Sequence, residues 1–261
     1  MQIIKVKNGA YDEYEMLLLQ RDQYRKEASQ ILIAYTKRFG DLINSVFEKQ
    51  VSCIGLKKTI ALCQAAIHSG KSIDMDSIKS SIDAEMQAYY RQLEEMLAET
   101  RAAKESKQIP MVTMMEIRRI YRKLAKLIHP DINPESQKRP ELQDLWNRIV
   151  IAYENNDAKE LRELEVLTMK ALDQMEEHIE IDIPDLEEKI DALQAEISMI
   201  TGTAPYVYKE ILEDPDRSRQ KEEELKGQLE EYESYEEELQ SVLDEMISHG
   251  GGKITWRMNL H

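Results

Sequence analysis

Residues 117–131 have the sequence IRRIYRKLAKLIHPD, which is a locally basic stretch in an acidic chain. Apolar residues recur here every three or four positions, which is the spacing of one face of an α-helix. Basic residues occupy another face. Pro130 disfavours helical geometry at the residue before it, so the helix should end at His129. The stretch is therefore predicted to be a basic amphipathic helix with an abrupt end.

The rest of the chain is strongly acidic. Its 50 Asp and Glu residues outnumber 35 Lys and Arg residues, and the formal net charge is −15. Phosphate groups repel such a chain, which argues against general binding to nucleic acids or anionic membranes. Charged residues make up 33%, aromatic residues only 6%, and glycine and proline are scarce. This composition is typical of long helices, and we expect an all-α fold.

Several sequence features predict a soluble cytoplasmic protein. No run approaches the roughly 18 apolar residues of a membrane span, and no cationic leader precedes an apolar segment. Cys53 and Cys63 lack the paired spacing of a zinc or redox site. We expect them to be buried thiols in a reducing compartment.

The N-terminal region, residues 1–107, is predicted to be a helical hairpin with coiled-coil character. Helical spacing extends from Tyr11 to about Ser69, as one long helix or two collinear ones. A turn follows, and Asp74 or Asp76 can cap the next helix. The apolar seam of that second helix comprises Met86, Tyr90, Leu93 and Leu97.

The central region, residues 108–180, is predicted to hold further helices. Thr113 and Glu116 have the spacing of a capping box, which predicts a helix start just before Ile117. Another helix should begin near Glu141, and Asp157 is a good cap for the one after it.

Residues 181–249 contain two heptad segments with a short connection, so we predict a second antiparallel coiled-coil hairpin. The pairing could form within one chain or between two, which leaves a homodimer open. Residues 250–261 end in an alternating pattern typical of a strand. The matching pattern at residues 3–7 suggests that the two termini pair as a small β-ribbon.

No pattern in the sequence predicts catalysis. There is no glycine-rich phosphate loop, no nucleophile elbow and no cluster with metal-ligand spacing. His129 and Asp131 flank a proline, and no third group is evident to orient them. We therefore expect no enzyme activity, no cofactor and no metal. The basic helix is then a structural helix, a nucleic-acid contact or a docking surface for an acidic protein.

The central residues resemble the J-domain family, the DnaJ-type cochaperones. The match consists of Tyr-Arg-Lys-Leu-Ala at 121–125, His-Pro-Asp at 129–131 and Asn-Pro at 133–134. It continues in the next helix with Trp146, Ile149, Ala152 and Tyr153, and it spans residues 115 to about 156. The family's Tyr-Tyr-x-x-Leu-Gly-type first helix, its glycine/phenylalanine-rich linker and its zinc module have no counterpart here.

The resemblance implies a function and a set of site residues. J-domains bind DnaK-type heat-shock chaperones and stimulate their ATP hydrolysis, so this chain would act on a partner's chemistry. The residues that match the family's chaperone-binding surface are Arg118, Tyr121, Arg122, Lys123, Lys126, His129, Pro130, Asp131 and Asn133. We call these nine residues the docking face. The coiled coils would then target an unknown client. The alternative is a scaffolding coiled-coil protein with a degenerate J-like module.

Overall fold

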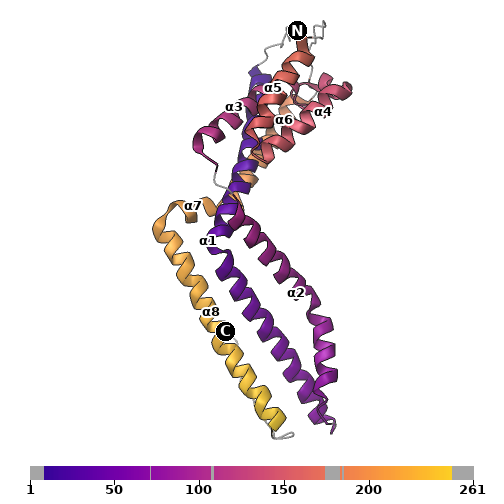
Figure 1. The fold of residues 1–261 in the computed structure, drawn as a ribbon, viewed down its shortest axis with the longest axis vertical. Coiled ribbons are helices and arrows are strands. Elements are labelled where there is room, and N and C mark those ends of the chain that lie inside the picture. Colours follow the sequence, from indigo (N-terminus) through magenta and orange to yellow (C-terminus); the bar gives the residue numbers. More distant parts are fainter. Residues whose placement is uncertain (1–8, 71, 107–108, 174–182, 184, 249–261) are drawn as a thin grey trace. The chain divides into compact units, whose positions relative to one another are not determined.

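The computed structural model describes residues 9–70, 72–106, 109–173, 183 and 185–248, and over these residues the chain is all-α without strands. The predicted terminal β-ribbon lies outside the described residues. No described helix is long and apolar enough to cross a membrane. The α-helices are α1 (Gly9–His68), α2 (Met75–Glu105), α3 (Met111–Ile128), α4 (Pro140–Glu154), α5 (Ala158–Asp173), α6 (Leu186–Gly202), α7 (Tyr208–Glu213) and α8 (Pro215–Ser248), as Figure 1 shows.

The chain packs into two units. Among the described residues, unit 1 takes those within 9–32 and 109–208, and unit 2 those within 33–106 and 209–248. Helix α1 contributes its first part to unit 1 and its second part to unit 2. Each unit therefore combines segments distant in sequence, whereas the sequence predicted four consecutive domains.

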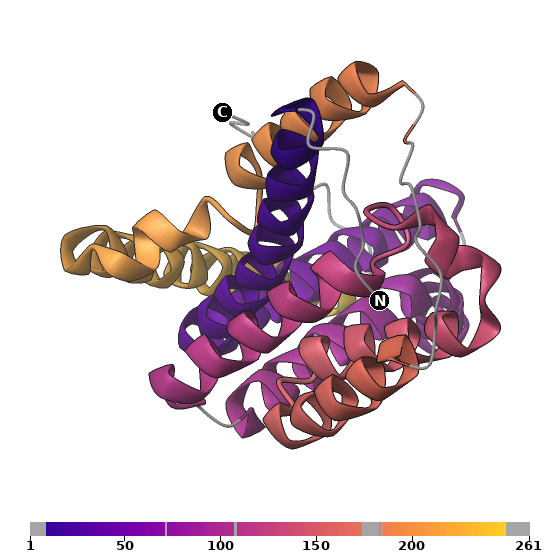
Figure 2. The same cartoon turned by 90° about the horizontal axis from the view of Figure 1, so that it is seen from above.

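The main core of unit 1 lies between α3, α4 and α5, which pack against one another (Figure 2). Its fully buried residues are Ile117, Ile120, Leu124, Ala125, Ile128, Ile149, Leu161 and Leu164. The stripe predicted at residues 117–128 thus faces the core. Asp157 caps α5 as predicted, because its Oδ1 accepts the Glu160 N–H at 2.9 Å.

The predicted start of α3 was wrong. The helix begins at Met111, after Pro110, and lacks a side-chain cap. Glu116 does not close a capping box, because its carboxylate binds the Arg162 guanidinium of α5 at 2.7 Å. An ion pair with another helix has taken the place of the predicted local hydrogen bond. The predicted end of the helix is confirmed, since α3 stops at Ile128.

A second apolar cluster in unit 1 joins the first part of α1 to α6. It comprises Tyr11, Tyr14, Leu17 and Leu18 of α1, Ile190 and Leu193 of α6, Ile183, and Ile132 from the loop after α3. The heptad seam of α6 therefore packs on α1.

Unit 2 is built on the second part of α1. Cys53, Ile60 and Cys63 of α1 pack with Leu239, Leu243 and Met246 of α8. The seams of α6 and α8 thus each contact α1, whereas the sequence predicted that these helices pack on each other. Helix α2 pairs with α1 as predicted: Asn44 Nδ2 donates to Thr100 Oγ1 at 2.9 Å, and Asp74 caps its start. The predicted seam of α2 is only partly correct, because Met86 is buried but Tyr90 and Leu97 are exposed. Both cysteines are buried and free.

Candidate partner-docking site

The loop after α3 is held by its own side chains. The Asp131 N–H donates to His129 Nδ1 at 3.0 Å, so the neutral imidazole carries its proton on Nε2. Asn133 Nδ2 donates to the Leu127 carbonyl at 3.1 Å, and Ser136 Oγ donates to the Asn133 carbonyl at 2.6 Å. These contacts satisfy backbone groups left open where the helix stops. The His-Pro-Asp tripeptide is therefore fixed at the end of α3.

Aromatic contacts join α3 and the loop to α4. Tyr121 stacks on Tyr153 with ring centroids 3.8 Å apart, and His129 meets Trp146 edge-on at 4.6 Å. Residue numbers rise along α3 as they fall along α4, so the two helices are antiparallel. The loop lies at their junction. The residues that carried the family resemblance in these helices are therefore in contact with one another.

The first part of α1 contacts this same surface. The Tyr121 hydroxyl donates to Asp22 Oδ2 at 2.7 Å, and Lys126 Nζ forms an ion pair with Glu15 at 2.6 Å. Arg122 donates to the Gln23 side chain.

The loop is also covered from α1. The Tyr11 hydroxyl donates to the Ile132 carbonyl at 2.9 Å, and His129 Nε2 lies 3.9 Å from Asp22 Oδ2. His129 is only 6% exposed, although Asp131 beside it is exposed. The first residue of the tripeptide, His129, is therefore buried, while its last residue, Asp131, faces solvent.

The remaining docking-face residues differ in their surroundings. Lys123 is exposed and binds Glu165 of α5 at 2.8 Å. Arg118 is half-buried, and its Nε has no hydrogen-bond partner. Asn133 is buried with its Oδ1 unpaired, and Pro130 is half-buried. The nine residues form one continuous stretch of α3 and the following loop, but only part of that stretch is open.

Burial dominates the electrostatics of the site. It lowers the pKa of His129 below its usual value, although Asp22 and Asp131 favour the charged form and Arg21 opposes it. The pKa of Tyr121 is raised by burial and by the Asp22 carboxylate. The imidazole is accordingly neutral and the phenol protonated at neutral pH.

Acidification should destabilise unit 1 through His129. The unfolded chain binds a proton at this residue near its ordinary pKa of about 6.5, while the folded chain resists protonation. The contribution of neutral His129 to the free energy of unfolding should therefore be complete above about pH 6.5. It should be lost as the pH falls towards the lower pKa of the folded chain. Urea unfolding at pH 7.5, 6.5 and 5.5 measures this loss.

Trp146 fluorescence in a Trp256→Phe background reports on unit 1, because the chain has two tryptophans. His129→Gln should flatten the pH dependence between pH 7.5 and 5.5. His68→Gln, at an exposed histidine of unit 2, should leave it unchanged. An unchanged slope in His129→Gln would contradict the assignment.

Two cavities border the loop in unit 1. Pro130 and Asp131 line one of about 440 Å³, with Tyr14 of α1 and Leu193 of α6. His129 lines another of about 420 Å³ beside Asp22, Lys26 and Tyr153. The Lys26 ammonium lies 4.0 Å from the Tyr153 ring centroid, and burial lowers its pKa to about 8. α1 thus forms a wall of both cavities.

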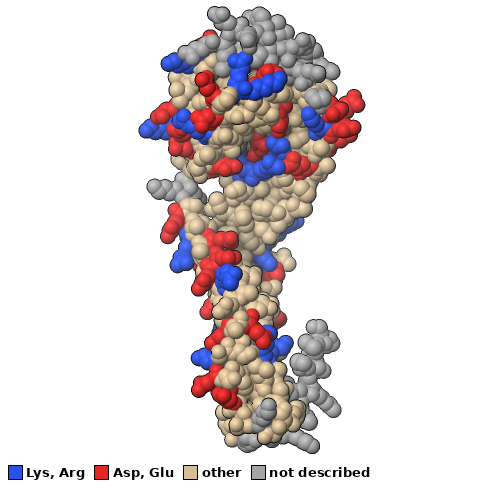
Figure 3. Space-filling model, turned by 90° about the vertical axis from the view of Figure 1, so that its right-hand side faces the viewer, with Lys and Arg blue, Asp and Glu red and all other residues tan. Residues whose placement is uncertain are grey.

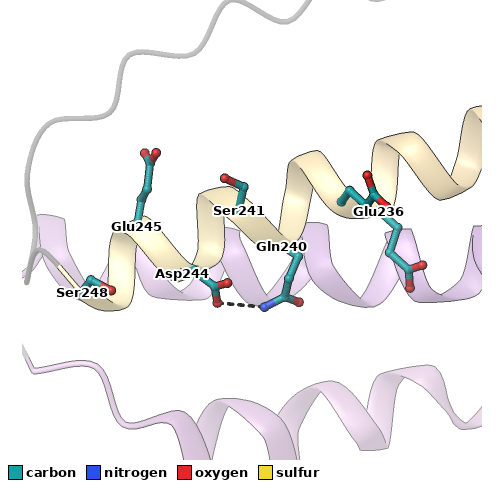
Figure 4. A pocket seen from close by; sticks show the side chains of 7 residues that line it. Glu236, Gln240, Ser241, Asp244, Glu245 and Ser248 are labelled. Carbon is teal, nitrogen blue, oxygen red and sulfur yellow. Dashed lines mark hydrogen bonds between the residues drawn. The ribbon is translucent and has the colours of Figure 1, made fainter.

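Charged side chains elsewhere do not gather into a single-sign surface on the face drawn in Figure 3, where basic and acidic groups are interspersed. A further cavity of about 650 Å³ runs along α8 in unit 2. Figure 4 shows its side chains projecting from one helix in different directions, with Gln240 donating to Asp244. They do not converge on a common point. We therefore assign no site to this cavity.

No sequence motif marks the residues of α1 that contact α3, the following loop or α4. Five of these residues are Tyr11, Glu15, Leu19, Asp22 and Lys26. They recur at spacings of four, four, three and four, which places them on one face of a helix. The signal was present as a stripe that mixes aromatic, acidic and apolar residues, but a mixed stripe does not stand out by hydrophobicity.

Comparison with models of protein families, with curated proteins and with solved structures finds no match to this chain.

Proposed function

We propose that the chain is a J-domain-type cochaperone that docks on a DnaK-type heat-shock chaperone and stimulates its ATPase. It has no catalytic site of its own in this proposal and acts in the cytoplasm. The nine residues of the docking face make the contact, and His129, Pro130 and Asp131 are the trigger. The long helices outside α3–α5 bind the client or target.

One observation carries the proposal: the His-Pro-Asp loop lies at the junction of two antiparallel helices that share an aromatic contact. Tyr121 and His129 from α3 and its end meet Trp146 and Tyr153 of α4. The exposed cations of this surface, including Arg122 and Lys123, provide charge complementarity for an acidic partner. Packing alone would not require an exposed Asp131 after the proline.

A second candidate function is a scaffolding protein with a degenerate, non-stimulating J-like module. The burial of His129 favours this alternative, because the imidazole packs on Trp146 as a core residue would. In this case the tripeptide only terminates α3. The two candidates differ in whether His129 affects a partner.

Single-turnover ATP hydrolysis by a DnaK-type chaperone tests the proposal. The full chain, titrated to saturation, should accelerate hydrolysis, and His129→Gln should remove most of that acceleration. The matched control is His68→Gln, which makes the same substitution at an exposed position of unit 2. It should stimulate like the native chain.

Circular dichroism and the urea midpoint of each variant establish that it is folded. Equal stimulation by the native chain and by His129→Gln would refute the trigger role. Absence of stimulation by every form of the chain, including the opened variants described below, would leave the scaffolding alternative.

A further inference from the structure

The surface proposed to bind a chaperone is already occupied within this chain. Residues 11–26 of α1, which we call the cover segment, run along α3 and the following loop inside unit 1. Their polar contacts reach Tyr121, Arg122 and Lys126 on the helix and the Ile132 carbonyl in the loop. Three of these contacts are made to residues that are proposed to bind the chaperone.

The charges of the cover segment match those expected of the partner. Glu15 and Asp22 are both largely buried, with side chains 7% and 11% exposed, and they lie against Lys126, Tyr121 and His129. An acidic chaperone surface would present carboxylates to the same groups. The cover segment therefore offers the chemistry of the partner from within the chain, and the two cannot occupy the surface together.

The contact between the cover segment and α3 is more polar than the other contact of α1 in unit 1. Tyr14, Leu17 and Leu18 pack on α6 in an apolar cluster, whereas Leu19 is the α1 residue in the α3–α5 core. Interfaces that open reversibly between parts of a chain are commonly more polar than permanent ones. Moving residues 11–26 off α3 would leave the α1–α6 contacts of this cluster in place, but it would expose Ile132, which the loop after α3 contributes to the cluster.

We propose that the cover segment autoinhibits the docking face, so that a chaperone gains access to His129 only after residues 11–26 have moved away. This inference rests on the proposed function. The apparent affinity for the chaperone is then the intrinsic affinity reduced by the fraction of molecules in which the cover is open. Weakening the cover raises that fraction without altering any residue of the docking face.

The test uses the full chain with two substitutions in the cover segment, Glu15→Lys and Asp22→Lys. Each replaces an attraction to the docking face with repulsion or with loss of a hydrogen-bond acceptor. The matched control, Asp12→Lys with Glu13→Lys, makes the same change of net charge at exposed positions near the start of the same helix. The milder pair Glu15→Gln with Asp22→Asn keeps the size of the side chains, in case the charge reversal prevents folding.

Two measurements test the autoinhibition separately from the proposed cochaperone function. Amide hydrogen exchange of residues 117–133 reports opening without any chaperone. Single-turnover ATP hydrolysis reports stimulation. We expect opened variants to exchange about tenfold faster in this segment and to reach half-maximal stimulation at about a tenfold lower concentration. The control should match the native chain in both.

Each other outcome overturns the inference in a recognisable way. If both cover variants exchange like the control, these contacts do not hold the cover in place. If exchange accelerates but native and opened chains stimulate equally, the cover is not inhibitory, and the proposed function stands. If exchange accelerates and neither native nor opened chain stimulates, the proposed function itself has failed.

Discussion

Replacing Leu124 with alanine is expected to lower the free energy of unfolding of unit 1 by about 2–5 kcal/mol. Leu124 is 0% exposed and lies in the core between α3, α4 and α5. Removing its methyl groups forfeits their transfer free energy and leaves a cavity, which the surrounding helices can only partly fill. Urea unfolding followed by Trp146 fluorescence, in the Trp256→Phe background, measures the change.

Leu167→Ala is the matched control, because this leucine of α5 is 42% exposed. The same substitution at a surface position should cost within about 0.5 kcal/mol. A loss below about 1 kcal/mol for Leu124→Ala would contradict the packing of α3 described above. A similar loss for both variants would show that burial of Leu124 is not the cause, and helix propensity cannot explain it either, because alanine favours a helix more than leucine does.

Tyr121→Phe is expected to destabilise unit 1 by about 1.5–3 kcal/mol, the range for a hydrogen bond to a charged group. The phenol is 5% exposed and donates to Asp22 at 2.7 Å. Asp22 also pairs with Arg21, so the single variants alone do not isolate this contact. The double-mutant cycle of Tyr121→Phe with Asp22→Asn isolates it, because contributions that the two residues do not share cancel.

The coupling free energy from this cycle should be stabilising and above about 0.5 kcal/mol. Tyr90→Phe, at a tyrosine of α2 that is 44% exposed, is the control for loss of a hydroxyl. A coupling of zero would show that the cover segment is not held through this hydrogen bond. The cycle therefore measures how strongly the Tyr121–Asp22 contact holds the cover segment in the free chain, whether or not a chaperone binds.

Local signals predicted much of the helical structure. The sequence predicted one long helix or two collinear ones for this region, and α1 is a single helix in spite of Gly40 and Gly55. The C-terminal end of α3 and the caps at Asp74 and Asp157 follow from backbone chemistry within a few residues. The capping box at Thr113 and Glu116 failed, because Arg162 offered the carboxylate a stronger charged partner from α5.

The candidate site was only half predictable. The docking face follows from one continuous stretch, since its residues lie on one helix and the loop that ends it. The residues that cover it are more than 90 positions away in sequence, and one pair joins Tyr121 with Asp22. Their stripe on α1 carries no motif, and nothing in local propensity assigns Glu15 to Lys126. Only the packing of α1 on α3 brings these charges together.

The sequence by itself determined the all-α class, the end of α3 at the His-Pro-Asp tripeptide and the apolar stripes that each helix must bury. These depend on the 3.6-residue period and on proline, which act within a turn or two. The tertiary structure decided which stripe meets which. It joined α6 and α8 to α1, and it placed α1 over His129. An amphipathic helix specifies that it needs a partner but not which one, because burial of apolar area is non-directional.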